Sequence, residues 1–197
     1  MKSKKMISEF WQWFIENSSR LSKVESDKNL LDALDQRVRD LNPRLSWEIG
    51  PGKVKEKQFV ISPNLDKGLR EEARSIISLA PSLDSWEFYP TRQVKDWDYQ
   101  VRLAPSEEEP AVAFDASGWK FVLLRYPDGL REVLLSGKVP SLSDNQRWQA
   151  AAFVLESILG EDQLMGSIDE FDLVPAFEPR FAERQRPLQA LKEAVQQ

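Results

Sequence analysis

The spacing of the hydrophobic residues changes after Pro43, and this change limits the folds that the chain can adopt. Before that point, apolar side chains recur every three or four residues from Ile7 onward, which predicts an amphipathic helix over residues 3–17. A second helical stripe, with Val24 near its start, predicts a helix over residues 19–41 that Asn42-Pro43 ends. Two helices are therefore expected before any strand.

Beyond the second helix, apolar and polar residues alternate as they do along β-strands. Alternation over residues 45–49 and 59–61, across the turn at Gly50-Pro51-Gly52, predicts a β-hairpin. A helical stripe over residues 69–80 and a strand over residues 86–92 follow. This part of the chain is predicted to form a ββαβ unit.

The second half of the chain has a similar order. Turn residues separate three predicted strands, at 112–114, 119–126 and 130–135. Ser143 and Gln146 have the spacing of a capping box and predict a helix that Gly160 closes. A last strand is expected over residues 168–174, and a short helix follows Pro187.

These elements predict an α+β fold with a mainly antiparallel sheet and helices on one face, preceded by the two N-terminal helices. Residues 45–92 and 112–174 each contain strands, then a helix, then a strand. We therefore predict a ββαβ pseudo-repeat, in which the second copy carries an extra strand.

The predicted organisation has four segments within one compact domain. They are an N-terminal helical segment (1–43), a first ββαβ unit (44–104), a second β-meander/α/β unit (111–175) and a C-terminal tail with a short helix (176–197). The polar run Glu107-Glu108-Glu109 is expected to be an exposed connection, and the tail is expected to pack loosely.

Neither histidine nor cysteine occurs among the 197 residues. These side chains are the ones most often used for proton transfer near neutral pH, thiol chemistry and zinc binding. The sequence therefore leans against an enzyme, and no cofactor is expected. A net charge of −5 argues against nucleic-acid binding, and the lack of a long apolar run argues against a membrane span. We expect a cytoplasmic protein.

The chain has seven tryptophans, and most of them are expected in the core because their side chains bury a large apolar area. Four lie at patterned positions that predict burial: Trp47, Trp86, Trp119 and Trp148.

Other positions are candidates for a surface that binds a partner or a ligand. Trp11 and Trp13 point in different directions on a helix, so one of them is expected to stay exposed. Trp97 and Tyr99 lie in a polar stretch, and Arg92 follows a strand where it could bind a carboxylate or a phosphate.

Carboxylates provide the remaining catalytic possibility. Glu170 and Asp172 share one face of a predicted strand, whereas Asp169 faces the other way. Together with Glu161 in the preceding loop, the first two could form a site, with or without Mg²⁺ or Ca²⁺. A solvated outer face explains the same pattern.

Several segments resemble a bacterial family of uncharacterised proteins. They are Phe10-Trp11-Gln12-Trp13-Phe14, Leu45-Ser46-Trp47-Glu48-Ile49-Gly50, Phe59-Val60-Ile61-Ser62, Ala80-Pro81 with Trp86, and Leu155-Glu156-Ser157-Ile158-Leu159-Gly160-Glu161. The resemblance implies a bacterial cytoplasmic protein and supplies no catalytic residues. The chain departs from the family pattern at residues 162–165.

The leading hypothesis is a non-enzymatic protein-interaction module of a regulatory, adaptor or toxin-neutralising type, whose partner is another protein. Negative charge, abundant tryptophan and the missing catalytic residues support it. The alternative is a ligand-binding domain or an enzyme with a carboxylate-based site. A third hypothesis is self-association through the aromatic N-terminal helix.

Overall fold

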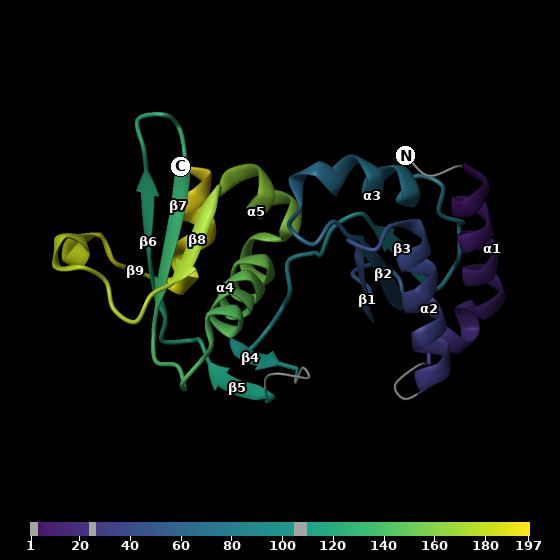
Figure 1. The fold of residues 1–197 in the computed structure, drawn as a ribbon, viewed down its shortest axis with the longest axis horizontal. Helices are drawn as coiled ribbons and strands as arrows, with labels where there is room; N and C mark the ends of the chain where they lie inside the picture. Colours follow the sequence, from purple (N-terminus) through teal and green to yellow (C-terminus); the bar gives the residue numbers. More distant parts are fainter. Residues whose placement is uncertain (1–3, 24–26, 105–109) are drawn as a thin grey trace. The chain divides into compact units, whose positions relative to one another are not determined.

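The computed structural model of the protein describes residues 4–23, 27–104 and 110–197 (Figure 1). The chain divides into two compact units, Met1–Arg92 and Gln93–Gln197, where the sequence suggested one domain. The boundary between the units lies before Trp97 and Tyr99, so both of these aromatic residues belong to the second unit. Val24 and the run Glu107-Glu108-Glu109 lie outside the described residues.

Two helices open the first unit, as predicted, but the boundary between them differs. Helix α1 spans Lys4–Leu21 and helix α2 spans Lys28–Leu41. Asp27 caps α2, because its carboxylate accepts a hydrogen bond from the backbone N–H of Leu30 at 3.1 Å. The prediction that the second helix begins near residue 19 is therefore wrong, since those residues still belong to α1.

Three strands form the sheet of the first unit in the order β1-β2-β3. Strands β1 (Ser46–Pro51) and β2 (Lys57–Ser62) form the predicted antiparallel hairpin. A 3₁₀ turn, η1 (Lys67–Leu69), and helix α3 (Arg70–Ile77) then lead to β3 (Trp86–Tyr89), which pairs parallel with β2.

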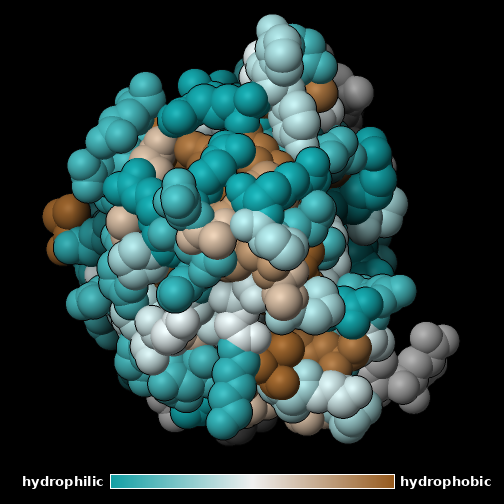
Figure 2. Space-filling view, turned by 90° about the vertical axis from the view of Figure 1, so that its left-hand side faces the viewer, coloured by the Kyte–Doolittle hydropathy of each residue, from teal (hydrophilic) through white to brown (hydrophobic). Residues whose placement is uncertain are grey.

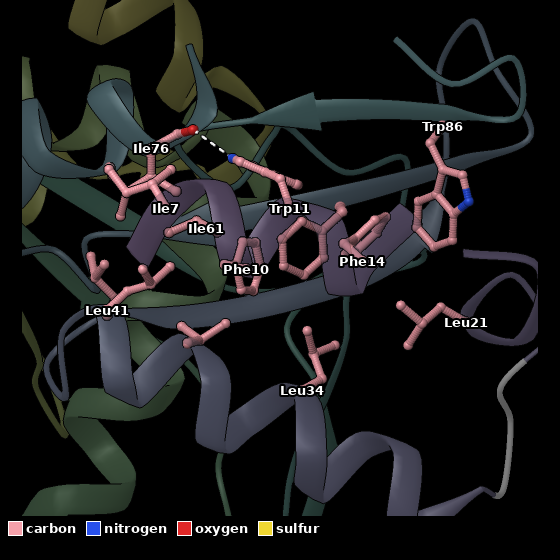
Figure 3. Close-up of a cluster of buried hydrophobic side chains, with 14 of the residues drawn as sticks. Ile7, Phe10, Trp11, Phe14, Leu21, Leu34, Leu41, Ile61, Ile76 and Trp86 are labelled. Atoms are coloured by element: carbon pink, nitrogen blue, oxygen red, sulfur yellow. Dashed lines mark hydrogen bonds between the residues drawn. The ribbon is translucent and has the colours of Figure 1, made fainter. Parts of the chain in front are cut away.

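The core of this unit lies between the three helices and one face of the sheet. Phe59 of β2 lies opposite Ile49 of β1 and Phe88 of β3, so aromatic and aliphatic side chains share the face toward the helices. Phe14 of α1 is completely buried, with its ring centroid 4.9 Å from that of Phe59. Figure 3 shows this cluster, with Leu34 of α2 pointing toward the aromatic rings of α1.

The second unit begins with an antiparallel pair, β4 (Gln100–Leu103) and β5 (Val112–Asp115). A separate four-stranded sheet has the order β8-β7-β6-β9. Its members are β6 (Lys120–Arg125), β7 (Arg131–Ser136), β8 (Glu170–Leu173) and β9 (Arg186–Pro187). Strand β7 pairs antiparallel with β6 and parallel with β8.

Helix α4 (Asp144–Leu159) has the predicted capping box. The Ser143 hydroxyl oxygen accepts a hydrogen bond from the backbone N–H of Gln146, and the side-chain oxygen of Gln146 accepts one from the backbone N–H of Ser143. Gly160 ends it in the left-handed region, with φ of 77°. Helix α5 (Glu161–Ser167) follows at once and was not predicted. Glu161 therefore lies in the first turn of a helix, where a carboxylate is favoured by the helix dipole, and not in a loop.

The last residues complete the second unit. They form the 3₁₀ turns η2 (Pro179–Arg184) and η3 (Leu188–Ala190) and helix α6 (Leu191–Gln196). The prediction of a loosely packed tail is wrong, because Leu188 and Leu191 are completely buried. Arg125 of β6 also donates to the backbone oxygen of Ala194 at 3.0 Å.

The four-stranded sheet is covered on both faces. Helices α4 and α6 contact the face that carries Val133 and Leu135, whereas Phe181 of η2 packs against Val122 and Leu124 on the other. The fold class is α+β, as predicted. Both units contain two antiparallel strands, a helical connection and a strand parallel to the second, so they match the predicted pseudo-repeat in topology.

Within the described ranges, none of the helices combines the length and the apolar character that crossing a bilayer requires.

Candidate functional site

The N-terminal tryptophans belong to the core more than to a surface. Trp11 is 3% exposed, and its indole N–H donates to the backbone oxygen of Ile76 at 3.0 Å (Figure 3). Trp13 is half-buried beneath Arg37, whose guanidinium carbon lies 4.8 Å from the ring centroid. Trp11 therefore has to be withdrawn from the candidate surface, and the apolar face proposed for self-association already packs against the sheet.

The three other surface candidates lie in different units. Arg92 is half-buried in the first unit and donates to the hydroxyl of Ser46 at 2.7 Å, so it holds the start of β1. Trp97 and Tyr99 belong to the second unit, with ring centroids 5.0 Å apart. Trp97 also lies 5.5 Å from Phe153 of α4, which shows that this pair packs on the helix.

The carboxylates proposed as a cluster do not come together. Glu161 is completely buried at the start of α5, whereas Glu170 and Asp172 are exposed on β8. No group of three acidic side chains in the described ranges has an arrangement that could hold a metal ion. The strand alternation was correctly interpreted, since Glu170 and Asp172 do share a face of β8, but Glu161 belongs to a different environment.

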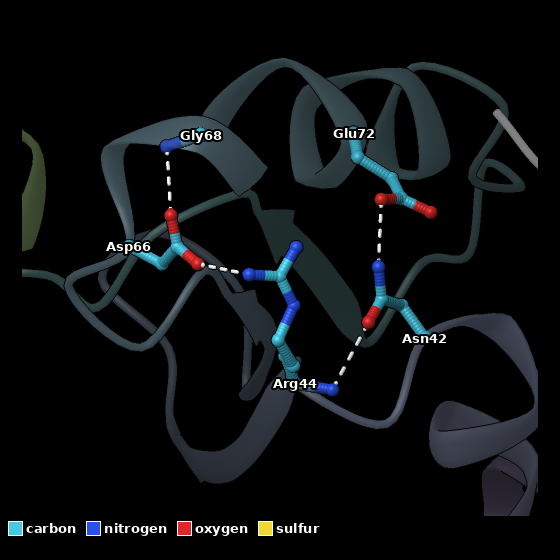
Figure 4. A network of polar contacts seen from close by, with 5 residues as sticks. All are labelled: Asn42, Arg44, Asp66, Gly68 and Glu72. Atoms are coloured by element: carbon cyan, nitrogen blue, oxygen red, sulfur yellow. Dashed lines mark hydrogen bonds and ion pairs between the residues drawn. The ribbon is translucent and has the colours of Figure 1, made fainter.

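A polar network in the first unit joins the end of α2 to the start of α3 (Figure 4). Asn42 donates to Glu72 at 2.8 Å, and Arg44 donates to one oxygen of Asp66 at 2.7 Å. The other oxygen of Asp66 accepts from the backbone N–H of Gly68 at 2.8 Å. Because both oxygens of Asp66 have partners within the unit, the network explains local structure and not ligand binding.

A pocket of about 340 Å³ in the first unit is lined by serines at the end of α1 and by residues 83–86. Two of its hydroxyls donate back into their own helix, from Ser18 to Ile15 and from Ser22 to Ser19. These two hydroxyl protons are therefore used in backbone hydrogen bonds within the helix.

A more apolar pocket of about 220 Å³ lies in the second unit, where the parallel strands β7 and β8 end. Residues 139–142, between β7 and α4, form one wall, and residues 173–175 at the end of β8 form another. Arg147 of α4 is the charged side chain in the lining, and it pairs with Asp144. The carboxyl ends of parallel strands are a common location for binding sites, because the connecting loops diverge there.

Trp148 lies next to Arg147 in the sequence and is 48% exposed, so the prediction that it fills the core is wrong. Its ring stacks on Phe171 of β8, with centroids 6.0 Å apart and planes at 30°. Phe171 and Leu173 share a face of β8, and Leu173 lines the pocket. We call Arg147, Trp148, Phe171, Leu173 and the pocket the edge site.

A signal for the exposure of Trp148 is present in the sequence. Asp144 and Asn145 precede it by four and three positions, so all three lie on one stripe of α4, and all are exposed. The polar character of the first two residues predicts a solvent-facing stripe, which the hydrophobic pattern of the rest of the helix obscures.

The opposite face of β8 is acidic. Glu132 of β7 lies beside Glu170 in the sheet register, and Asp172 lies beside Leu134. The hydrogen bond from the Tyr126 hydroxyl to Glu132 raises the pKa of Tyr126, and the negative charges of Glu132 and Glu170 add to this increase. The positive charge of Arg180 acts in the opposite direction, but the pKa stays above its ordinary value, so the tyrosine is neutral at physiological pH.

Comparisons with known proteins returned no matching family model, no similar curated protein and no similar solved structure.

Proposed function

We propose that the protein is a non-enzymatic protein-interaction module and that the edge site binds its partner. The observation that carries this proposal is the half-exposed Trp148, stacked on Phe171 beside an apolar pocket. Tryptophan is enriched among the residues that dominate binding energies, especially where it lies beside a pocket that excludes water.

The rest of the exposed apolar surface supports this choice. Figure 2 shows one face of the molecule, on which hydrophobic side chains form small patches among hydrophilic ones. Within the part of the chain that the structure describes, the large hydrophobic residues that are clearly exposed are Ile15, Val54, Leu79, Tyr126, Leu130 and Trp148. Single exposed apolar side chains are normal on protein surfaces, but Trp148 combines exposure with an aromatic partner and an adjacent pocket.

The test compares three forms of the tagged full chain in gentle recovery from its own organism, followed by native mass spectrometry. They are the unchanged protein, Trp148→Gln and the matched control Leu130→Gln, whose side chain is 46% exposed in the same unit. We expect a stoichiometric protein partner with the unchanged chain and with Leu130→Gln, and its loss with Trp148→Gln.

Two outcomes would contradict the proposal. Retention of the partner by Trp148→Gln would show that binding occurs elsewhere, and a bare chain in all three samples would remove the support for an interaction module. Circular dichroism of each variant establishes that it is folded before the comparison is made.

A further inference from the structure

We infer that the partner supplies an extended segment with alternating basic and apolar side chains, and that this segment pairs with the outer edge of β8. The inference rests on the proposed function and specifies the chemistry of the partner. It follows from three independent features of β8: an open edge, an apolar face and an acidic face.

The first feature is the position of β8 at the end of its sheet. The strand order is β8-β7-β6-β9, and among the strands of the described ranges only β7 pairs with β8. An edge strand presents backbone N–H and C=O groups that can pair with another extended chain. Extended peptides bind many proteins by adding a strand in this way.

The second feature is the apolar face. Side chains of an added strand that point toward α4 would meet Phe171 and Trp148, and then the pocket beside Leu173. Alternate residues of a strand share a face, so every second residue of the incoming segment should be apolar. The four residues of β8, followed by the pocket, correspond to a segment of about six residues.

The third feature is the charge of the other face. Glu170 and Asp172 are exposed, and neither has an ion pair among the residues that the structure describes. Glu132 adds a third carboxylate from the neighbouring strand. Residues of the incoming segment that point to this face should therefore be lysine or arginine.

The same charges disfavour a second copy of this chain as the occupant. Pairing of two β8 edges would bring Glu170 and Asp172 of one copy close to the same residues of the other, and like charges on adjacent strands repel. A basic partner segment removes this repulsion, so the charge of the edge selects against self-association.

The test uses a capped synthetic peptide of six residues, in which valine and lysine alternate, titrated into the full chain. Binding is measured by isothermal titration calorimetry and mapped by NMR chemical shifts. Two control peptides accompany it, one with glutamate in place of lysine and one with N-methyl groups on alternate backbone nitrogens. Two protein variants complete the set, Glu170→Lys and the matched charge reversal Glu193→Lys, at an exposed position of α6.

We expect the lysine peptide to bind and to shift the resonances of residues 170–173 and 148. The glutamate and N-methylated peptides should bind at least about tenfold more weakly, because one loses the charge pairs and the other loses the backbone hydrogen bonds. Glu170→Lys should weaken binding about fivefold, which corresponds to a single exposed ion pair, whereas Glu193→Lys should leave it within about twofold.

The inference is overturned by no binding, by equal binding of the N-methylated or glutamate peptide, or by shifts that map outside β8 and α4. Each of these results leaves the proposed function standing if Trp148→Gln still loses the captured partner. Conversely, if capture does not depend on Trp148, the proposed function fails whatever the peptide does.

Discussion

Replacement of Phe14 by alanine should strongly destabilise the first unit, because this side chain joins α1 to the sheet. It is completely buried, and its ring lies 4.9 Å from that of Phe59 and 5.1 Å from that of Trp86. Removal of a buried phenylalanine side chain costs about 3–5 kcal/mol of unfolding free energy. The lost aromatic pairs place Phe14→Ala toward the upper end, at about 4–5 kcal/mol.

Urea unfolding followed by far-ultraviolet circular dichroism measures this loss. With a slope of about 2 kcal/mol per molar urea, the midpoint of the transition should fall by about 2 M. The matched control is Ile15→Ala, the next residue of the same helix, whose side chain is 40% exposed. That change should cost less than about 1 kcal/mol, because the side chain loses little packing.

A small difference between the two variants would refute the reasoning. If Phe14→Ala unfolds within about 1 kcal/mol of Ile15→Ala, then α1 does not pack on the sheet through this residue. A weak effect of Phe14→Ala together with a strong effect of Ile15→Ala would place the opposite face of α1 in the core.

Two further changes test the packing and the pH dependence. Gly137→Ala should lower the unfolding free energy by about 1–3 kcal/mol in the same urea experiment, because the added Cβ would overlap the Trp119 indole. The control Gly166→Ala has open space around the added Cβ and should be neutral or stabilising. Equal urea midpoints for the two variants would contradict this prediction. Burial raises the pKa of Glu87, but hydrogen bonds from the backbone N–H groups of residues 53–55 outweigh it and lower the pKa overall. The ionised form therefore stabilises the fold above the unfolded pKa of about 4.3, and this stabilisation is lost as the pH falls through the lower folded pKa. The unchanged chain should have a higher unfolding free energy than Glu87→Gln, and this difference should become smaller as the pH falls from about 5 to about 3. A difference that stays constant over this range would contradict the assignment.

The sequence predicted the types of most elements, because the signals that specify them are local. The capping box of Ser143 and Gln146 and the stop at Gly160 act within a few residues, so they locate α4 without knowledge of the fold. The same reasoning missed α5, because Glu161 and Asp162 follow a glycine that both ends one helix and begins the next.

The candidate site was harder to predict, since exposure depends on what covers each element. Trp148 lies on a helix with an apolar pattern, yet the stacked Phe171 covers only part of its ring. Trp11 showed the opposite error, because the backbone of Ile76, distant in the sequence, provides the partner for its indole N–H. Strand alternation correctly placed Glu170 and Asp172 on one face, but it carried no information on Glu161.

By itself, the sequence determined most of the helices and strands and the α+β class, because hydrophobic periodicity and capping act over a few neighbouring residues. The tertiary structure alone decided that β8 pairs parallel with β7 and stands at the edge of its sheet, that β9 lies at the other edge, and that the final helix buries its apolar side chains. Strand pairing joins residues that are far apart in the chain, and no local pattern specifies which strand remains at an edge.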